Sequence, residues 1–258
     1  MRIVVLVKEV PDTWGDRTLD LETGLADRGA SEAVLDEIGE RALEVALSYA
    51  DAHAGTEVVA IMMAPESAAA TLRKALAMGA SSAVHVADEK LHGADLSLTA
   101  DVLAAAVRRA GADLVVTGNL STDGAGGVLP AMLAEHLALP QLTALTSVDV
   151  ADDRVAGTRA SDAGTVSVSA PLPAVISITE ALPDARFPNF KGIMAAKKKP
   201  FETLTAADLG VDPEDFSVPR AIMVSVAQRP PRAAGTKIVD EGDAGTQLAD
   251  FLVQNRLA

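Results

Sequence analysis

The sequence has no cysteine and few aromatic residues, and each shortage excludes a class of site. Without cysteine, the 258 residues can form no disulfide, no thiolate metal site and no cysteine nucleophile. Aromatic residues make up 3% of the chain, which is low for a surface that stacks bases, so a bound ring should meet mainly aliphatic side chains and backbone. The four histidines are scattered without metal-ligand spacing, and we therefore expect no metal site.

Charge and hydropathy narrow the class of protein further. The formal net charge of -14 argues against a nucleic-acid partner, because proteins that bind nucleic acid present basic surfaces. No apolar run is long enough to span a bilayer, so we expect no direct membrane insertion. Met1 leads almost at once into an apolar strand-like run rather than into a signal peptide, which favours a cytoplasmic protein.

The first half of the chain alternates between short apolar runs and amphipathic segments. We predict strands at residues 2–7, 56–62, 82–86 and 113–117, and helices within residues 31–54, 67–78, 96–110 and 126–139. This alternation predicts an α/β fold with a doubly wound, mostly parallel, Rossmann-like sheet. Four strand-like runs follow, at residues 142–150, 154–159, 165–170 and 174–179, which we expect to extend the sheet as an antiparallel meander.

The sequence beyond residue 183 lacks this rhythm. We assign residues 1–183 to the α/β domain and residues 184–258 to an extended C-terminal arm, with a short helix at 205–209, a strand-like run at 220–227 and an amphipathic helix at 243–257. Phe187, Phe190, Ile193 and Met194 are apolar residues in a segment whose prolines and lysines would keep it at the surface. Such exposed anchors favour contact with a partner chain. A loop that folds back onto its own domain is the alternative.

A glycine-rich turn follows the fourth predicted strand. Residues 114–130, LVVTGNLSTDGAGGVLP, read as strand, turn and helix. Such a turn lets backbone amides approach an anion at a helix start, so residues 121–127 are the best candidate phosphate site, with Ser121, Thr122 and Asp123 as added donors or a helix cap. The alternative is a tight connection without a ligand. The turn matches neither the dinucleotide fingerprint nor the P-loop.

The chain shows no arrangement of residues that predicts catalysis. No pattern pairs its loop carboxylates as acid and base, and no serine lies in a nucleophile elbow. Lys197, Lys198 and Lys199 form the single basic run, which is either a solvated face or a patch that steers acidic partners. Trp14, the only tryptophan, lies on the long loop after the first strand. It either packs on a neighbouring element or covers a cofactor or a subunit boundary.

Several stretches resemble one known family. These are VLVKEVPD at residues 5–12, TLRKALAMGA at residues 71–80, the TGNLSTDG turn, and LPAVISI followed by FPNFKGIMAAKKKP. Together they resemble the beta subunit of electron transfer flavoprotein over nearly the whole chain. The resemblance implies a heterodimer in which an alpha subunit holds FAD, while this chain binds AMP structurally. It also implies an electron carrier without catalytic residues of its own.

The resemblance places the AMP contacts at four separate segments. By position these are Leu6 in the first strand, Asp36, Glu37, Ile38 and Gly39 at the second loop, Met63 after the next strand, and the turn formed by Gly118, Asn119, Leu120, Ser121, Thr122, Asp123, Gly124, Ala125, Gly126 and Gly127. All four lie at predicted strand ends or helix starts. Asp36 stands where the family usually has asparagine, and a carboxylate there should face ribose hydroxyls or adenine rather than phosphate. The turn is also shorter than the usual one, which would shift phosphate contacts to backbone amides.

The resemblance also implies a loop at residues 189–199 that recognises partner dehydrogenases. Phe190 takes the place of the leucine that anchors this loop in the partner's pocket, and the contact residues would be Asn189, Phe190, Lys191, Gly192, Ile193, Met194, Lys197 and Lys198. Electrons would pass from acyl-CoA and related dehydrogenases, as in fatty acid β-oxidation, to a membrane quinone oxidoreductase. Two alternatives remain: an electron-bifurcating relative with a second FAD in this subunit, and a stand-alone regulatory domain that binds an adenine nucleotide.

Overall fold

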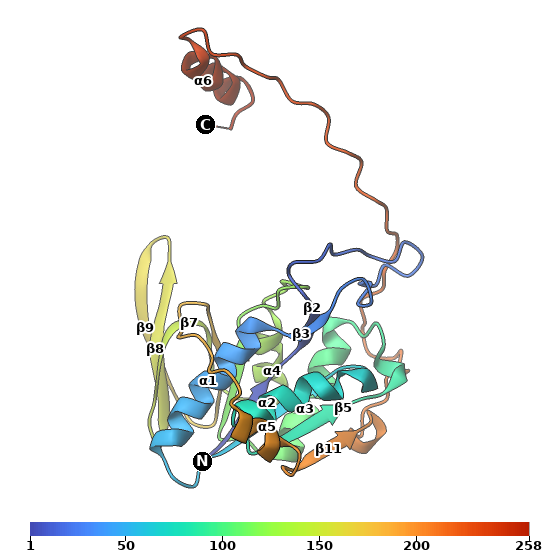
Figure 1. The fold of residues 1–258 in the computed structure, drawn as a ribbon, viewed down its shortest axis with the longest axis vertical. Helices are drawn as coiled ribbons and strands as arrows, with labels where there is room; N and C mark the ends of the chain where they lie inside the picture. The colour runs from blue at the N-terminus through green and yellow to red at the C-terminus, as the bar shows by residue number, and fades with distance from the viewer. Residues whose placement is uncertain (258) are drawn as a thin grey trace. The chain divides into compact units, whose positions relative to one another are not determined.

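The computed structural model describes residues 1–257, which fall into an N-terminal unit, Met1–Ser225, and a C-terminal unit that begins at Val226. The N-terminal unit is built on a nine-stranded sheet with the order β11-β5-β4-β1-β6-β10-β7-β8-β9 (Figure 1). Its strands are β1 (Arg2–Leu6), β4 (Glu57–Met63), β5 (Ser82–Val86), β6 (Leu114–Gly118), β7 (Gln141–Val150), β8 (Arg154–Ser161), β9 (Gly164–Pro171), β10 (Ala174–Ile178) and β11 (Phe201–Leu204).

Seven neighbouring strands of this sheet, β11 to β7, run parallel, and β8 and β9 extend it as an antiparallel hairpin. This arrangement confirms the predicted doubly wound, mostly parallel sheet with antiparallel strands at one edge. The prediction that β10 belongs to the meander was wrong. This strand pairs in parallel with both β6 and β7, inside the sheet. All five residues of its sequence, AVISI, are buried, as is usual for a central parallel strand covered on both faces.

The segment after residue 183 also contributes to the sheet. β11 pairs in parallel with β5 and forms the edge opposite β9 (Figure 1). Four residues are too few for periodicity to reveal a strand, and the prolines before them hid it. The strand predicted at residues 220–227 is wrong, because that stretch has no regular structure and most of it is exposed. The predicted short helix is confirmed as a 3₁₀ turn, η3 (Ala207–Leu209).

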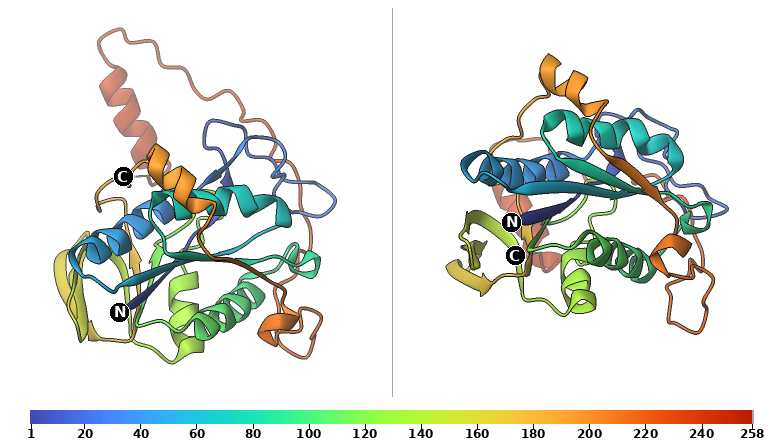
Figure 2. Two further views of the ribbon diagram at one scale, coloured as in Figure 1. Left: turned by 60° about the horizontal axis from the view of Figure 1, so that its bottom comes forward. Right: turned by 90° about the horizontal axis from the view of Figure 1, so that it is seen from below.

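Helices cover both faces of the sheet. α1 (Glu37–Ala52) and α2 (Ala69–Met78) lie on one face, and α3 (Leu96–Ala110) and α4 (Leu129–Leu137) lie on the other (Figure 2). α5 (Phe190–Ala196) packs on the outside of α2. A two-stranded sheet of β2 (Glu9–Pro11) and β3 (Ala33–Leu35) brackets the long loop after β1, and two short turns, η1 (Glu66–Ala68) and η2 (Glu89–Leu91), complete the unit.

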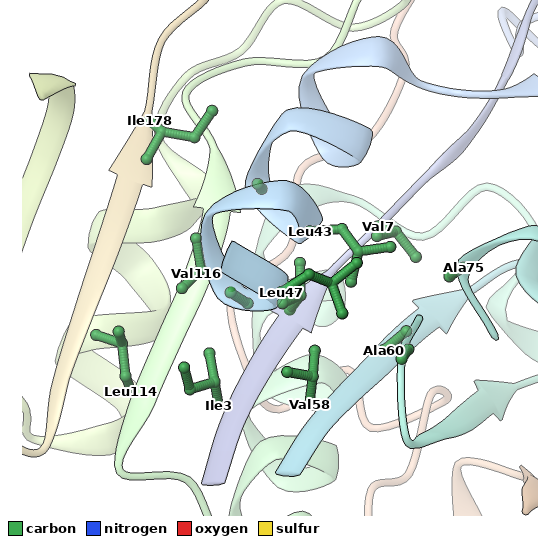
Figure 3. Packing of buried hydrophobic residues seen from close by; sticks show 14 of the residues in the cluster. Ile3, Val7, Leu43, Leu47, Val58, Ala60, Ala75, Leu114, Val116 and Ile178 are labelled. Atoms are coloured by element: carbon green, nitrogen blue, oxygen red, sulfur yellow. The ribbon is translucent and has the colours of Figure 1, made fainter. Parts of the chain in front are cut away.

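The core on the α1 side is shown in Figure 3. Leu43 and Leu47 of α1 pack on Ile3, Val58 and Leu114, which come from three neighbouring strands, and none of the five is more than 4% exposed. Burying one such side chain stabilises the fold by roughly 1.5–3 kcal/mol. This packing holds the middle of α1 against the amino-terminal halves of the strands, and the start of α1 lies at the carboxyl end of β6, where Ile38 meets Gly118.

The C-terminal unit contains one helix, α6 (Ala244–Gln254), among its described residues. The helix confirms the prediction at residues 243–257. Leu248, Phe251 and Val253 are between 45% and 66% exposed, so α6 buries little apolar surface in this chain alone. No helix of the part of the chain that the structure describes is long and apolar enough to cross a bilayer.

Candidate functional site

The carboxyl ends of β1 and β6 meet the first turn of α1. Ile38 lies against Gly118, where an added Cβ would come within 2.6 Å of the isoleucine side chain. Gly39 also faces Val7, but an added Cβ there would be 3.5 Å from the valine Cα, an ordinary contact distance. Gly118 is therefore the glycine that lets the helix start approach the strand end closely. Ligands of open α/β sheets bind at this edge.

Asp36 links this helix start to the glycine turn. It occupies the residue before α1, but its side chain does not cap that helix. Instead, its Oδ2 accepts a hydrogen bond from the backbone amide of Thr122, at 3.0 Å. Only 2% of Asp36 is exposed. The structure thus joins two segments that the sequence placed separately at the candidate site.

Two polar atoms at this junction have no partner within the described chain. They are Asp36 Oδ1 and Thr122 Oγ1, both buried. Burial is the main cause that raises the pKa of Asp36. The nearby Asp123 carboxylate raises it further, and the hydrogen bond from the Thr122 backbone amide opposes both. A buried acceptor without a donor is costly, by about 1–3 kcal/mol. A ligand that offers hydrogen-bond donors would satisfy both atoms.

Asp123, in the middle of the turn, binds two cationic side chains. Its carboxylate lies 2.7 Å from Lys8 Nζ and 3.0 Å from Arg28, and only 8% of its side chain is exposed. Lys8 also donates to Ser121 Oγ at 3.3 Å. Burial alone would raise the pKa of Asp123, but the hydrogen bond and charge of Lys8 hold it well below its ordinary value. Lys8 and Arg28 thus bring two positive charges beside the turn, next to the carboxyl groups of Asp123 and Asp36.

The sequence interpretation missed Lys8 and Arg28. Lys8 follows β1 directly, and a cation at the carboxyl end of a parallel strand is a usable signal for an anion site. Arg28 lies in the long loop between β2 and β3, where no pattern marks it. Its contact with Asp123 spans 95 residues and depends on the folded loop.

The turn itself has only one glycine whose backbone requires it. Gly127 has a φ of 67°, in the left-handed region, whereas Gly124 and Gly126 do not. Ala125 also has a positive φ, 49°, and its amide donates to the Ser121 carbonyl at 2.9 Å. α4 begins at Leu129 and no side chain caps it, so of the two roles expected for residues 121–123, donors or a helix cap, the structure excludes the cap. Gly124–Gly127 stay exposed, and their backbone is accessible to a ligand.

The remaining candidate contacts lie along the same sheet edge. Leu6 is buried at the end of β1 and pairs with Ile61 of β4, the strand that ends at Met63. Glu37 is exposed at the first turn of α1. Asn119 donates its amide to the Ile178 carbonyl, so the chain leaves the sheet between β6 and β10. All four predicted segments therefore end at neighbouring strands or at the helix above them.

The candidate recognition segment is helical rather than a loop. Asn189 caps α5 by accepting a hydrogen bond from the Gly192 amide at 2.8 Å. Phe190, Ile193 and Met194 lie at helical spacing and are 80%, 47% and 48% exposed. Lys197 and Lys198 are exposed just after the helix. Lys191 is exposed within the helix, so the segment presents three apolar side chains beside three positive charges.

Comparisons with known proteins agree with this arrangement. Residues 21–209 match the family model described as the electron transfer flavoprotein domain. The chain is 45% identical, over 263 aligned residues, to electron transfer flavoprotein subunit beta of Mycobacterium leprae, covering 99% of this chain and 98% of that protein. It is 32% identical to the protein of the same name from Syntrophomonas wolfei, covering 98% of this chain and 96% of that protein.

A third relative belongs to a larger complex. It is subunit CarD of the caffeyl-CoA reductase-Etf complex of Acetobacterium woodii, which is 31% identical and covers 98% of this chain and 97% of that protein. The match to the family model and the full-length relatives confirm the resemblance drawn from the sequence. The chain belongs to the family of electron transfer flavoprotein beta subunits.

Proposed function

We propose that this chain pairs with an alpha subunit that holds FAD, binds AMP at the glycine turn, and carries electrons without catalytic residues of its own. The heterodimer accepts electrons from acyl-CoA and related dehydrogenases and delivers them to a membrane quinone oxidoreductase. The observation that carries the nucleotide assignment is the junction of Asp36, Thr122 and the Lys8 and Arg28 pair. It offers both kinds of group that a nucleotide needs.

The two sides of this junction fit different parts of AMP. The two positive charges of Lys8 and Arg28, together with the exposed backbone of residues 124–127, suit a phosphate. The unpartnered Asp36 Oδ1 and Thr122 Oγ1 suit hydroxyl or amine donors, which adenosine carries. The reverse orientation would place the phosphate beside the buried carboxyl group of Asp36. Charge therefore favours the phosphate at Lys8 and Arg28 and the adenosine at Asp36.

The second candidate is a site for another FAD in place of AMP, as in an electron-bifurcating carrier. The relative in the caffeyl-CoA reductase-Etf complex favours keeping this candidate. FAD contains an adenosine and a diphosphate, so the same residues could serve either ligand. The count of flavins per heterodimer distinguishes the two.

Exposed apolar residues on several elements support the subunit and dehydrogenase contacts. Trp14 is 96% exposed on the loop between β2 and β3, so it does not pack on a neighbouring element of this chain. This exposure supports its place at a subunit or cofactor boundary. Phe216, Ile222 and Val224 are each more than 80% exposed in the segment after η3 and would contact the alpha subunit. The three apolar residues of α5 would dock the dehydrogenase.

Replacement of Phe190 by alanine tests the docking assignment. Hot-spot aromatic residues typically cost about 2 kcal/mol or more when truncated, so we expect Phe190→Ala to slow electron acceptance from an acyl-CoA dehydrogenase by roughly 30-fold at limiting concentrations. The flavin content should not change. Val166→Ala is the control, because Val166 is 56% exposed but lies on β9 rather than on α5. Equal rates for Phe190→Ala and the parent would contradict docking through this helix.

A further inference from the structure

The third lysine of the basic run does not belong to the charged surface. Lys199 donates to the carbonyl oxygens of Leu76 and Ala80, at 2.9 Å and 2.6 Å. These two residues flank the carboxyl end of α2, where helix carbonyls lack intrahelical partners and the helix dipole is negative. Burial lowers the pKa of Lys199, as expected for an ammonium withdrawn from water. Lys197 and Lys198, by contrast, are exposed.

α5 is short and depends on such contacts. A helix of seven residues is not stable alone, because helix formation has a costly nucleus. The side of α5 that faces α2 packs through its backbone, because an added Cβ at Gly192 would be 2.3 Å from the Ala77 carbonyl oxygen. Ala196 is its one buried side chain. No large side chain of α5 is fully buried, so contacts of the flanking residues help to hold the helix in place.

The chain before and after α5 is fastened to different helices. Before it, the Arg186 guanidinium forms a two-pronged contact with Glu44 of α1, at 2.8 Å for both nitrogens. After it, Lys199 binds the end of α2, and β11 then joins the sheet. Arg73 of α2 adds a contact to β11, because its guanidinium lies 4.4 Å from the centre of the Phe201 ring. Lys199 is the attachment nearest to α5 on the carboxyl side.

We propose that Lys199 is a positioning residue, which holds α5 against the carboxyl end of α2 and so fixes the direction in which Phe190, Ile193 and Met194 face a docking partner. The inference rests on the proposed docking function of α5. The three lysines of the basic run then have two different roles. Lys197 and Lys198 attract an acidic partner through solvent, whereas Lys199 acts through the fold and does not meet the partner.

Two variants with the same change in charge test this separation. Lys199→Met removes the ammonium bound to α2, and Lys198→Met removes an exposed ammonium one residue away. Both are made in the heterodimer with its alpha subunit. Hydrogen exchange should become faster in residues 190–196 of Lys199→Met, because the helix loses its attachment, while exchange in α1 stays as in the parent. Lys198→Met should exchange like the parent throughout. Unchanged exchange in Lys199→Met would overturn the proposal.

Salt dependence provides the second readout, with the heterodimer as the varied electron acceptor for a purified acyl-CoA dehydrogenase. We expect Lys199→Met to raise the KM for the heterodimer about fivefold with kcat within about twofold, as for a less well presented docking face. This defect should persist at about 1 M salt, where charges are screened beyond about 3 Å. The effect of Lys198→Met should disappear there. Lys199→Arg keeps donors for the two carbonyls and should restore most of the KM.

Phe190→Ala, measured in the same assay, distinguishes a failure of the role of Lys199 from a failure of docking through α5. If Phe190→Ala raises the KM and Lys199→Met does not, Lys199 is not a positioning residue, and the docking function stands. If Phe190→Ala leaves the KM unchanged, docking through α5 is contradicted, and the role of Lys199 in docking falls with it. A Lys199→Met defect that vanishes with salt as that of Lys198→Met does would make Lys199 another steering charge.

Discussion

Asp36 Oδ2 accepts a hydrogen bond from the Thr122 amide at 3.0 Å, although the two residues lie 86 positions apart. The start of α1 and the glycine turn are therefore one unit. The bond leaves the other carboxylate oxygen of Asp36 without a donor in a buried position. The free chain thus carries an unsatisfied acceptor at the place where we propose that adenosine binds.

Asp36→Asn should stabilise the protein at neutral pH. Burial raises the pKa of Asp36, so the folded state holds this proton more tightly than the unfolded chain, where the pKa is about 3.9. The contribution of Asp36 to folding stability therefore falls as pH rises from about 3.9 through the higher pKa of the folded state. We expect the asparagine variant to be more stable than the parent by about 1 kcal/mol at pH 7 and by nothing below about pH 4. Thermal unfolding at both pH values checks this, and a less stable variant at pH 7 would contradict it.

Asp123→Asn should have the opposite effect. The pKa of Asp123 is held low by Lys8, so its ionised form stabilises the folded state above the unfolded pKa, and this stabilisation is lost as pH falls. Lys8 and Arg28 are each more than 40% exposed, so solvent screening limits the loss at pH 7 to about 1 kcal/mol. The melting temperature should fall at pH 7 and approach that of the parent at low pH. Equal melting temperatures at pH 7 would show that the pair contributes nothing.

Gly118→Ala tests the close approach of α1 to β6. The added methyl group would lie 2.6 Å from the Ile38 side chain, so either the isoleucine or the helix start must move. Overpacking of this kind costs about 1–3 kcal/mol. Gly126→Ala is the matched control, because its nearest neighbour would be 3.8 Å away. We expect a lower melting temperature for Gly118→Ala alone. Ile38→Ala removes both Cγ atoms that the new methyl group would meet, so Gly118→Ala, Ile38→Ala should lose less stability than the sum of the two single variants. A similar fall for both glycine variants would argue against packing as the cause.

Local sequence signals predicted the parallel core well. β5 and α3 have the predicted bounds, because β5 is a compact apolar run and α3 lies between the Asp95 cap and Gly111. Asp95 accepts from the Leu98 amide at 2.8 Å, as an N-cap does. Such elements are specified by their own residues, so a pattern within one segment is enough to find them.

The features that the sequence did not reveal depend on distant partners. β10 is a strand in the prediction and in the structure, but only its neighbours β6 and β7 decide that it lies inside the sheet. The contact of Asp123 with Arg28 arises only when the long loop folds over the turn, and its contact with Lys8 only when β1 and β6 lie side by side. Lys199 looks like its two neighbours in sequence, and the end of α2 alone distinguishes it.

The nucleotide content of the heterodimer tests the central claim most directly. The chain is co-expressed with its alpha subunit, and the bound nucleotides are released from the purified complex with acid and separated by chromatography. One FAD and one AMP per heterodimer is the predicted result, and Asp36→Ala should lower the AMP content without lowering the FAD content. Two FAD and no AMP would contradict the account and assign the glycine turn to a second flavin.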